Sequence, residues 1–356
     1  MGGKRIGILT SGGDCAGLNA ALRAVVHRAI RNYGWKVFGI RDGSLGLMDR
    51  PLNYVEFDLG SVADDMLRRG GTILGTINKG DPFAYPMPDG SKKDRSQDFV
   101  DGYKELGIEA LVVIGGDGSM RILNDLCRKG GIPKTIDNDV AHTDYAIGFA
   151  TALNVAGEAM DRLAPTAASH HRIMILEVMG RDVGHIALNA GIAGGADVVL
   201  IPEIPYTLEG IAAKIAEVRA EGRNHALMVV AEGCKTASGD SVTKLQSGGE
   251  ARYGGIGQYL AARLTDMVDA ETRVTVLGHV QRGGMPAMRD RIIASAFGVY
   301  AADLIAQGKL GRMVAWQHGQ VVDVPITDVA GITRAIDPYG TLAHTARGLG
   351  IYLGEL

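Results

Sequence analysis

The chain has 356 residues, 46% of them hydrophobic and 22% charged, so it can bury the cores of two ordinary domains. Its net charge of −3 gives no support for a nucleic-acid partner or for attraction to a membrane surface. Three widely spaced cysteines without a CxxC pair argue against a zinc site or a disulfide framework and favour a reducing cytoplasm. No apolar run is long enough to cross a bilayer.

Apolar runs typical of strands alternate with segments whose apolar residues have helical spacing. We expect a strand within 5–14 that ends in a Ser-Gly-Gly turn, a helix over 18–34 and a strand over 36–40. Further strands are expected within 110–119, 172–180, 197–203, 226–233 and 272–280. This alternation indicates an α/β fold of mainly parallel sheets covered by helices on both faces, with ligands beyond the carboxyl ends of the strands. The adjacent His170 and His171 are expected on opposite sides of a strand.

Two glycine-rich turns, "TSGGD" at 10–14 and "GGDGS" at 115–119, each follow an expected strand and precede a helix. Glycine lets backbone amides approach a phosphate, and the N-terminus of the following helix favours its negative charge. Neither turn is a Walker loop, and no strict GxGxxG is present, which counts against a dinucleotide site. Either turn alone is as well explained by a tight chain reversal. Two of them at parallel strand ends favour a phosphate ligand, and Asp117 could hold Mg²⁺ through water.

The stretch "TIDND", at 135–139, places Asp137 and Asp139 two residues apart. By itself it would be a solvated turn, but beside phosphate-binding turns it suggests a general base and an acid on the metal side. His279 either contacts a ligand or has a structural role only. Four arginines at or beside expected strand ends are either solvated or converge as a phosphate clamp: Arg172, Arg181, Arg273 and Arg282.

Taken in order, eight motifs resemble the 6-phosphofructokinase family over about residues 5–300: "LTSGGDCAGLNAALR", "GGTILGT", "VVIGGDGS", "PKTIDND", "SHHR", "EVMGR", "AGIAGGADVVLIPE" and "ETRVTVLGHVQRGG". The resemblance implies two Rossmann-like α/β domains and usually a homotetramer. It also implies Mg²⁺-dependent phosphoryl transfer to O1 of fructose 6-phosphate, which gives fructose 1,6-bisphosphate. We expect a phosphate-donor domain of 1–148 plus about 281–330. A sugar-phosphate domain of 149–280 plus about 331–356 would complete the chain.

The resemblance also assigns roles to single residues. Asp137 resembles the catalytic base, with Lys134 and Arg181 as cations in the catalytic group, and Thr135 and Asp139 shape the site. Asp117 resembles the Mg²⁺-associated aspartate. Arg172 and Arg273 match arginines that reach a neighbouring subunit's site, so activity would need a dimer or tetramer. The expected donor contacts are Gly13, Asn78, Lys79, Gly116, Asp117, Gly118 and Ser119, and the expected sugar-phosphate contacts are Met179, Gly180, Arg181, Glu232, His279 and Arg282.

Two positions give opposite indications about the phosphoryl donor. Gly118 is the small residue of ATP users, because an aspartate there would crowd and repel the α-phosphate of a nucleotide. Lys134 is typical of pyrophosphate users. On steric grounds we expect ATP, with pyrophosphate as the alternative. A larger sugar phosphate such as sedoheptulose 7-phosphate could fit the same arginines.

Two further departures from the family pattern concern the chain before Ile132 and the effector pocket. The short apolar strand that normally precedes "IPKTIDND" is nearly missing, so either this loop is remodelled or residues are absent from the sequence. Arg23 and Arg50 match two effector-site arginines, whereas His27 and Ala164 replace two others, which predicts a weak or altered response to ADP or phosphoenolpyruvate.

Two other classes of function are open to this sequence. A non-catalytic regulator that binds sugar phosphate or nucleotide would have no need of a base such as Asp137. A dinucleotide oxidoreductase is disfavoured by the missing fingerprint.

Overall fold

The computed structural model describes residues 3–78, 80–124, 126, 129–245 and 251–355. The chain divides into two compact units. Unit 1 consists of Met1–Thr151 and Arg282–Arg334, and unit 2 consists of Ala152–Gln281 and Ala335–Leu356. The chain therefore passes between the units at three points, after Thr151, Gln281 and Arg334.

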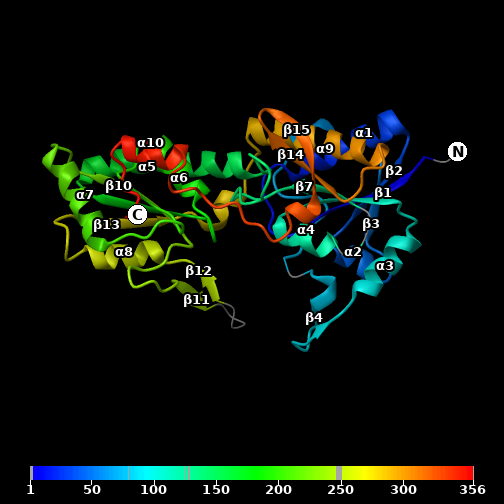
Figure 1. The fold of residues 1–356 in the computed structure, drawn as a ribbon, viewed down its shortest axis with the longest axis horizontal. Coiled ribbons are helices and arrows are strands. Elements are labelled where there is room, and N and C mark those ends of the chain that lie inside the picture. Colours follow the sequence, from blue (N-terminus) through cyan, green and yellow to red (C-terminus); the bar gives the residue numbers. More distant parts are fainter. Residues whose placement is uncertain (1–2, 79, 125, 127–128, 246–250, 356) are drawn as a thin grey trace. The chain divides into compact units, whose positions relative to one another are not determined.

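Unit 1 contains a seven-stranded sheet in the order β15-β14-β7-β6-β1-β2-β3. The strands from β14 to β2 are parallel, and the edge strands β15 and β3 pair antiparallel to them. Figure 1 shows α1 and α9 on one face of this sheet and α2, α3 and α4 on the other. The strands are β1 (Arg5–Thr10), β2 (Lys36–Ile40), β3 (Tyr54–Phe57), β6 (Ala110–Gly115), β7 (Lys129–Pro133), β14 (Arg312–Gln317) and β15 (Gln320–Pro325). The helices are α1 (Leu18–Tyr33), α2 (Leu45–Met48), α3 (Ser96–Glu105), α4 (Asp117–Asn124) and α9 (Met288–Ala306).

Unit 2 contains a four-stranded sheet in the order β13-β8-β10-β9, in which all the strands are parallel. Figure 1 shows α6 and α8 on opposite faces of it. Its strands are β8 (Ile173–Val178), β9 (Val198–Leu200), β10 (Ala226–Ala231) and β13 (Thr272–Val276). Its helices are α6 (His185–Ala193), α7 (Leu208–Ala220), α8 (Ile256–Leu264) and α10 (Thr341–Gly348), and α5 (Phe149–His170) begins in unit 1 and continues into unit 2. Smaller elements are the hairpins β4 (Tyr85–Pro86) with β5 (Lys92–Lys93) and β11 (Thr243–Leu245) with β12 (Ala251–Tyr253), and the 3₁₀ turns Asp64–Leu67, Pro82–Ala84, Gly278–Arg282 and Ile326–Asp328.

The mixed α/β architecture with mainly parallel sheets confirms the fold class expected from the sequence, but two local expectations are wrong. The strand thought to be nearly missing is present as β7, which pairs with β6 from Lys129 to Pro133. Its Gly-Gly sequence has no apolar pattern, yet sheet hydrogen bonds use only backbone groups. The His170–His171 pair lies at the end of α5 and not in a strand, and His171 has a φ of 57°.

Burial in unit 1 anchors the loop that follows β7. Val140 is fully buried and clusters with Met120 of α4 and with Met313 and Ala315 of β14.

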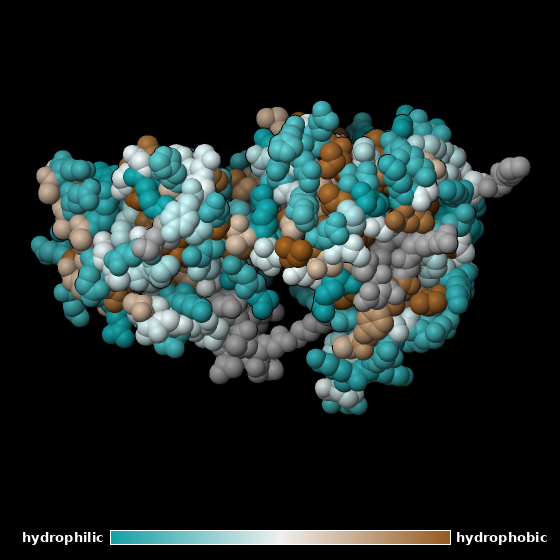
Figure 2. All heavy atoms as spheres, in the orientation of Figure 1, coloured by the Kyte–Doolittle hydropathy of each residue, from teal (hydrophilic) through white to brown (hydrophobic). Residues whose placement is uncertain are grey.

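On the face drawn in Figure 2, hydrophilic side chains predominate and apolar ones are scattered between them. No helix in the described part of the chain is both long enough and apolar enough to cross a membrane.

Asp290 joins the start of α9 to the start of α5. Its carboxylate is fully buried and accepts hydrogen bonds from the amides of Gly148 (3.0 Å) and Thr151 (2.8 Å) and from the Thr151 hydroxyl. The same hydroxyl accepts a hydrogen bond from the Ala287 amide at 2.9 Å. A carboxylate at a helix N-terminus satisfies amides that have no partner inside the helix.

We therefore expect Asp290→Ala to lower the free energy of unfolding by about 3 kcal/mol, because buried donors lose their acceptor. Urea denaturation of the variant measures this change. Asp303→Ala, which removes a partly exposed partner of Arg28 on the same helix, is the control and should cost about 1 kcal/mol or less. Equal losses in the two variants would contradict the role of Asp290.

Candidate functional site

Three loops of unit 1 lie at the carboxyl ends of β1, β6 and β7, which are neighbours in the sheet. The amide of Ser11, after β1, donates to the carbonyl of Ile114 in β6 at 3.0 Å. The Ser119 hydroxyl, in the first turn of α4, donates to the Ser11 hydroxyl at 2.9 Å. The amide of Lys134, after β7, donates to the Gly115 carbonyl at 3.1 Å. Both glycine-rich turns and the "TIDND" stretch thus meet at one edge of one sheet, as their positions after parallel strands predicted.

The turn that contains Gly13 is also held by the chain around Ile77. The Gly12 amide donates to the Ile77 carbonyl at 3.1 Å, and the Thr76 hydroxyl donates to the Gly12 carbonyl at 2.6 Å. Asn78 follows directly and is exposed, so its side chain is available to a ligand beside this turn. The expected contact Lys79 lies outside the described residues.

Lys134 places a buried cation against the first glycine-rich turn. The residue is only 5% exposed, and its Nζ donates to the carbonyl of Gly13. Gly12 has a φ of +80°, and a Cβ added there would lie 3.1 Å from this Nζ. Burial lowers the pKa of Lys134, because the charged ammonium loses its hydration. An anion bound at this turn would stabilise the charged form of Lys134 in place of the lost water. The site therefore favours an anionic ligand such as a phosphate.

Asp137 lies in a loop with little conformational freedom. The Asp137 amide donates to the Thr135 hydroxyl at 3.1 Å, and the Thr135 amide donates to the Ile147 carbonyl at 3.1 Å. The following residue, Asn138, is 3% exposed and has a φ of 55°, a left-handed conformation that asparagine tolerates better than most residues. These contacts fix the backbone of the loop on both sides of the Asp137 side chain.

Asp139 and Asp117 provide the second and third carboxylates of this edge. Burial raises the pKa of Asp139, the Thr135 hydroxyl opposes the shift, and the negative charge of Asp117 adds to it. One oxygen of Asp117 accepts the amide of Gly331 at 2.6 Å. The described residues contain no cluster of three or more metal ligands. This donor set suits Mg²⁺, which takes one or two carboxylates and completes its shell with phosphate oxygens and water.

Gly118 is exposed, and a Cβ added to it would meet no atom within 4 Å. Gly116, at the start of the same turn, accepts the Met120 amide at 3.1 Å. The absence of a side chain at 118 is therefore not required by packing of the described residues. The open space beside the turn is consistent with a bulky phosphate donor.

Arg282 lies at the first glycine-rich turn. Its NH1 donates to the Asp14 carbonyl at 3.0 Å, and a Cβ added to Gly13 would lie 2.6 Å from the same atom. The resemblance assigned this arginine to the sugar phosphate, and that role stays a prediction. In unit 1 its guanidinium lies as a second cation beside the turn that Lys134 also contacts.

The expected sugar contacts Met179, Gly180, Arg181 and Glu232 are brought together in unit 2, at the carboxyl ends of β8 and β10. The Glu232 amide donates to the Val178 carbonyl at 2.9 Å, and the Gly233 amide donates to the Gly180 carbonyl at 3.0 Å. Gly180 has a φ of +142°. A Cβ at Gly233 would overlap the Arg181 carbonyl at 1.8 Å, so the two backbones pack directly against each other. His279 is exposed in the 3₁₀ turn that follows β13.

Gln281 holds the loop that contains Met179 and is not among the site residues expected from the sequence. Gln281 is 1% exposed, and its Oε1 accepts the Met179 amide at 2.6 Å. Its Nε2 is buried without a hydrogen-bond partner among the described residues. Its place between His279 and Arg282 in "GHVQRGG" was the only signal in the sequence.

We expect Gln281→Leu to leave the Met179 amide without its acceptor and to destabilise the protein by about 2 kcal/mol. The KM for the sugar phosphate should rise, because the loop of Met179 is no longer fixed. Urea unfolding and steady-state kinetics measure the two effects. Gln320→Leu, at an exposed position in β15, is the control, and an unchanged KM in Gln281→Leu would refute the role of Gln281.

Of the two alternatives for the four arginines, solvation or convergence, convergence does not hold for the three that lie in unit 2. Arg172 directly precedes β8 and Arg273 is the second residue of β13, so both lie at the amino ends of these strands. Arg181 follows the opposite end of β8, about 20 Å away by the length of the strand. Arg172 and Arg273 both form ion pairs with Glu271, and the Arg172 guanidinium holds the pKa of this carboxyl below its usual value.

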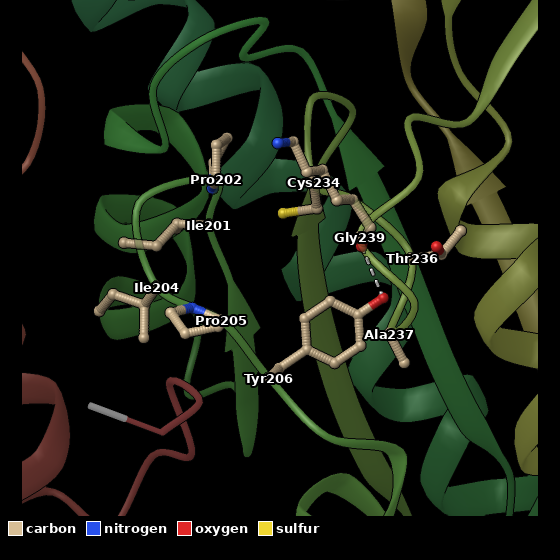
Figure 3. A pocket seen from close by; sticks show the side chains of 10 residues that line it. Ile201, Pro202, Ile204, Pro205, Tyr206, Cys234, Thr236, Ala237 and Gly239 are labelled. Carbon is tan, nitrogen blue, oxygen red and sulfur yellow. Dashed lines mark hydrogen bonds between the residues drawn. The ribbon is translucent and has the colours of Figure 1, made fainter.

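Unit 2 also has a small pocket whose lining contains none of the site residues expected from the sequence. Figure 3 shows residues 201–206, after β9, facing residues 234–239, after β10, and the hydroxyl of Tyr206 donates to the Lys235 carbonyl at 2.9 Å. The cavity has a volume of about 200 Å³ and a mainly apolar wall that includes Ile201, Ile204 and Cys234. Such a wall does not suit a phosphate, so the pocket is separate from the phosphate chemistry of the loops above.

Comparisons with known proteins agree on one family. The family model described as "Phosphofructokinase" matches residues 5–305. The chain is 55% identical over 357 residues to "ATP-dependent 6-phosphofructokinase 1" of Synechocystis sp. and 57% identical over 357 residues to the protein of the same name from Nostoc sp.. Both alignments cover 99% of each chain.

Two solved structures are similar to this chain. Phosphofructokinase from Saccharomyces cerevisiae matches with a TM-score of 0.77 and 30% identity over 91% of this chain. That match covers 45% of the yeast chain, so this chain spans less than half of its length. A pyrophosphate-dependent phosphofructokinase from Marinobacter aquaeolei has a TM-score of 0.78 at 21% identity, with 99% of this chain and 89% of that chain covered, and so shares the fold.

Proposed function

This chain belongs to the phosphofructokinase family, and we propose that it transfers a phosphoryl group from ATP to O1 of fructose 6-phosphate, giving ADP and fructose 1,6-bisphosphate. The observation that carries this proposal is the 55–57% identity, over 99% of both chains, to two relatives named ATP-dependent 6-phosphofructokinase. As a phosphotransferase of this type it takes part in glycolysis. The substrates are cytoplasmic metabolites, so the cytoplasm is our proposed location.

The reaction forms a bond between sugar O1 and the γ-phosphorus and breaks the bond between that phosphorus and the leaving oxygen of ADP. Asp137 accepts the proton of the 1-hydroxyl as attack begins. Lys134 and Arg282 offset negative charge at the donor turn, and the amides of Gly13 and of 116–119 bind phosphate oxygens. The protein thus contributes positioning, charge neutralisation and one base.

Asp117 is the residue that would hold Mg²⁺ in this proposal. The metal would neutralise charge on the donor phosphates when bound. Asp139, whose pKa is raised by burial and by Asp117, shapes the same edge. Thr135, through the bond from the Asp137 amide, fixes the base.

We propose that the sugar phosphate is contacted by Met179, Gly180, Arg181, Glu232, His279 and Arg282. Support comes from the packing of the Gly180 and Gly233 backbones at the carboxyl ends of β8 and β10, where ligands of parallel sheets bind.

The proposal is tested by initial rates with fructose 6-phosphate and Mg²⁺ and with either ATP or pyrophosphate as donor. Faster turnover with ATP supports it. Faster turnover with pyrophosphate would make the enzyme a pyrophosphate-dependent phosphotransferase, the alternative that Lys134 favours. Sedoheptulose 7-phosphate in place of fructose 6-phosphate defines the substrate range, and no turnover with either sugar would favour a binding protein.

We further propose that the enzyme is a homo-oligomer with shared sites. Support comes from Arg172 and Arg273, which lie at the opposite edge of the unit 2 sheet from Arg181 and therefore suit the site of a neighbouring subunit. The inactive variants Asp137→Asn and Arg273→Ala are dissociated, mixed and reassembled. Activity should return, because in a shared site of a mixed oligomer one subunit supplies Asp137 and the other supplies Arg273. Failure of the mixture to regain activity, with both variants oligomeric by light scattering, would contradict shared sites.

A further inference from the structure

The segment 331–334, at the end of unit 1, forms hydrogen bonds with the loop that carries the proposed base Asp137. Thr333 pairs with Val140 in an antiparallel bridge, and the Arg334 amide donates to the Asp139 carbonyl at 2.7 Å. The Arg334 side chain donates to the Asn138 carbonyl from Nε at 3.1 Å and from NH2 at 2.9 Å. The two side-chain bonds link positions 196 residues apart in the sequence.

The carbonyl held by Arg334 belongs to the most constrained residue of the loop. Asn138 has a left-handed backbone, and its side chain bridges the Asp144 carbonyl (3.1 Å) and the Ala146 amide (2.8 Å). Arg334 NH2 also reaches the Asp144 carbonyl at 3.3 Å. The guanidinium and the Asn138 side chain thus close the same loop from two sides.

The segment 331–334 also contacts Asp117, the residue proposed to hold Mg²⁺, because the Gly331 amide donates to its carboxylate at 2.6 Å. One short stretch therefore contacts both Asp117 and the loop of Asp137. Arg334 is moreover the last residue of unit 1 before the chain passes to unit 2.

We propose that Arg334 is a positioning residue for phosphoryl transfer, which sets the direction of the Asp137 carboxylate by fixing the Asn138 peptide. The inference rests on the proposed function. Arg334 does not need to touch substrate for this role. Its planar fork of donors reaches the Asn138 and Asp144 carbonyls, whereas a lysine ammonium on a flexible chain cannot reproduce that geometry.

The test compares Arg334→Ala and Arg334→Lys with the wild type by steady-state kinetics. We expect kcat to fall about 10²-fold in Arg334→Ala and less in Arg334→Lys, with KM for both substrates changed less than about threefold, because a base displaced by about 1 Å costs rate and not binding. Arg312→Ala is the matched control, since Arg312 is also partly buried in unit 1 but binds Asp323. Its kcat should remain unchanged.

A double variant separates positioning from general damage. If Arg334 acts through Asp137, adding Arg334→Ala to Asp137→Asn lowers kcat no further. Hydrogen exchange of amides 136–146 in the full chain should rise in Arg334→Ala, with other amides unchanged. A wild-type kcat in Arg334→Ala, or additive losses in the double variant, overturns the inference, whereas an inactive wild type overturns the proposed function itself.

Discussion

Asp137→Asn should lower kcat with fructose 6-phosphate and ATP by about 10³-fold, because the amide cannot accept the proton of the 1-hydroxyl. The change keeps the shape of the side chain, and the Asp137 amide still donates to the Thr135 hydroxyl, so the loop should keep its conformation. Binding of fructose 6-phosphate, measured by calorimetry, should change less than about threefold. A loss in kcat with retained binding is what a base, and not a binding residue, predicts.

Asp144→Asn is the matched control for this prediction. Asp144 lies in the same loop, but it is exposed and its carboxylate accepts the His318 amide at 3.1 Å. Its kcat should stay within about twofold of the wild type. Comparable losses in both variants would mean that the loop, and not the Asp137 carboxylate, is what the reaction needs.

Gly118→Asp should lower kcat/KM for ATP by about 10²-fold. A carboxylate about 6 Å from a nucleotide phosphate, at an effective dielectric constant of about 20, repels it by roughly 3 kcal/mol. The fold should persist, because the position is exposed, a Cβ there meets no atom within 4 Å, and an acid in the first turn of α4 favours the helix. Activity with pyrophosphate should fall less, since pyrophosphate has no α-phosphate to repel.

Two variants at the same position separate charge from size. Gly118→Asn has the volume of aspartate without its charge, and Gly118→Ala adds only the Cβ. We expect kcat/KM for ATP to decrease in the order alanine, asparagine, aspartate. If asparagine and aspartate are equally harmful, steric exclusion and not repulsion governs the donor, and if neither is harmful, Gly118 does not select ATP.

Much of the sheet edge that carries the two glycine-rich turns could be predicted because each of its parts is contiguous in the sequence. A strand, a glycine-rich turn and a helix N-terminus follow one another in "TSGGD" and "GGDGS", and parallel strands bring their carboxyl ends to one edge. The strand β7 was not predicted, because Gly130 and Gly131 pair through backbone groups and a hydropathy pattern does not record backbone pairing.

Contacts between distant parts of the chain were beyond such reasoning. Nothing in the sequence says that Arg282 rests on the Asp14 carbonyl, that Gln281 accepts the Met179 amide or that Arg334 holds the Asn138 carbonyl. Each contact depends on how packed elements align groups that are 102 to 268 residues apart in the sequence.

The sequence by itself therefore determined the α/β class and the positions of the two glycine-rich turns and of the "TIDND" stretch, since local periodicity and turn chemistry carry that information. The role of Asp137 as the base came from the family resemblance and stays a prediction. Only the tertiary structure decided which distant residues each loop contacts, because those contacts depend on how the packed elements align. The positions of the arginines, in contrast, follow from the direction of the strands. Arg172 and Arg181 are nine residues apart in sequence, yet the strand between them sends them to opposite edges of the sheet. Strand direction, and not proximity in sequence, determines which charges can act on one phosphate.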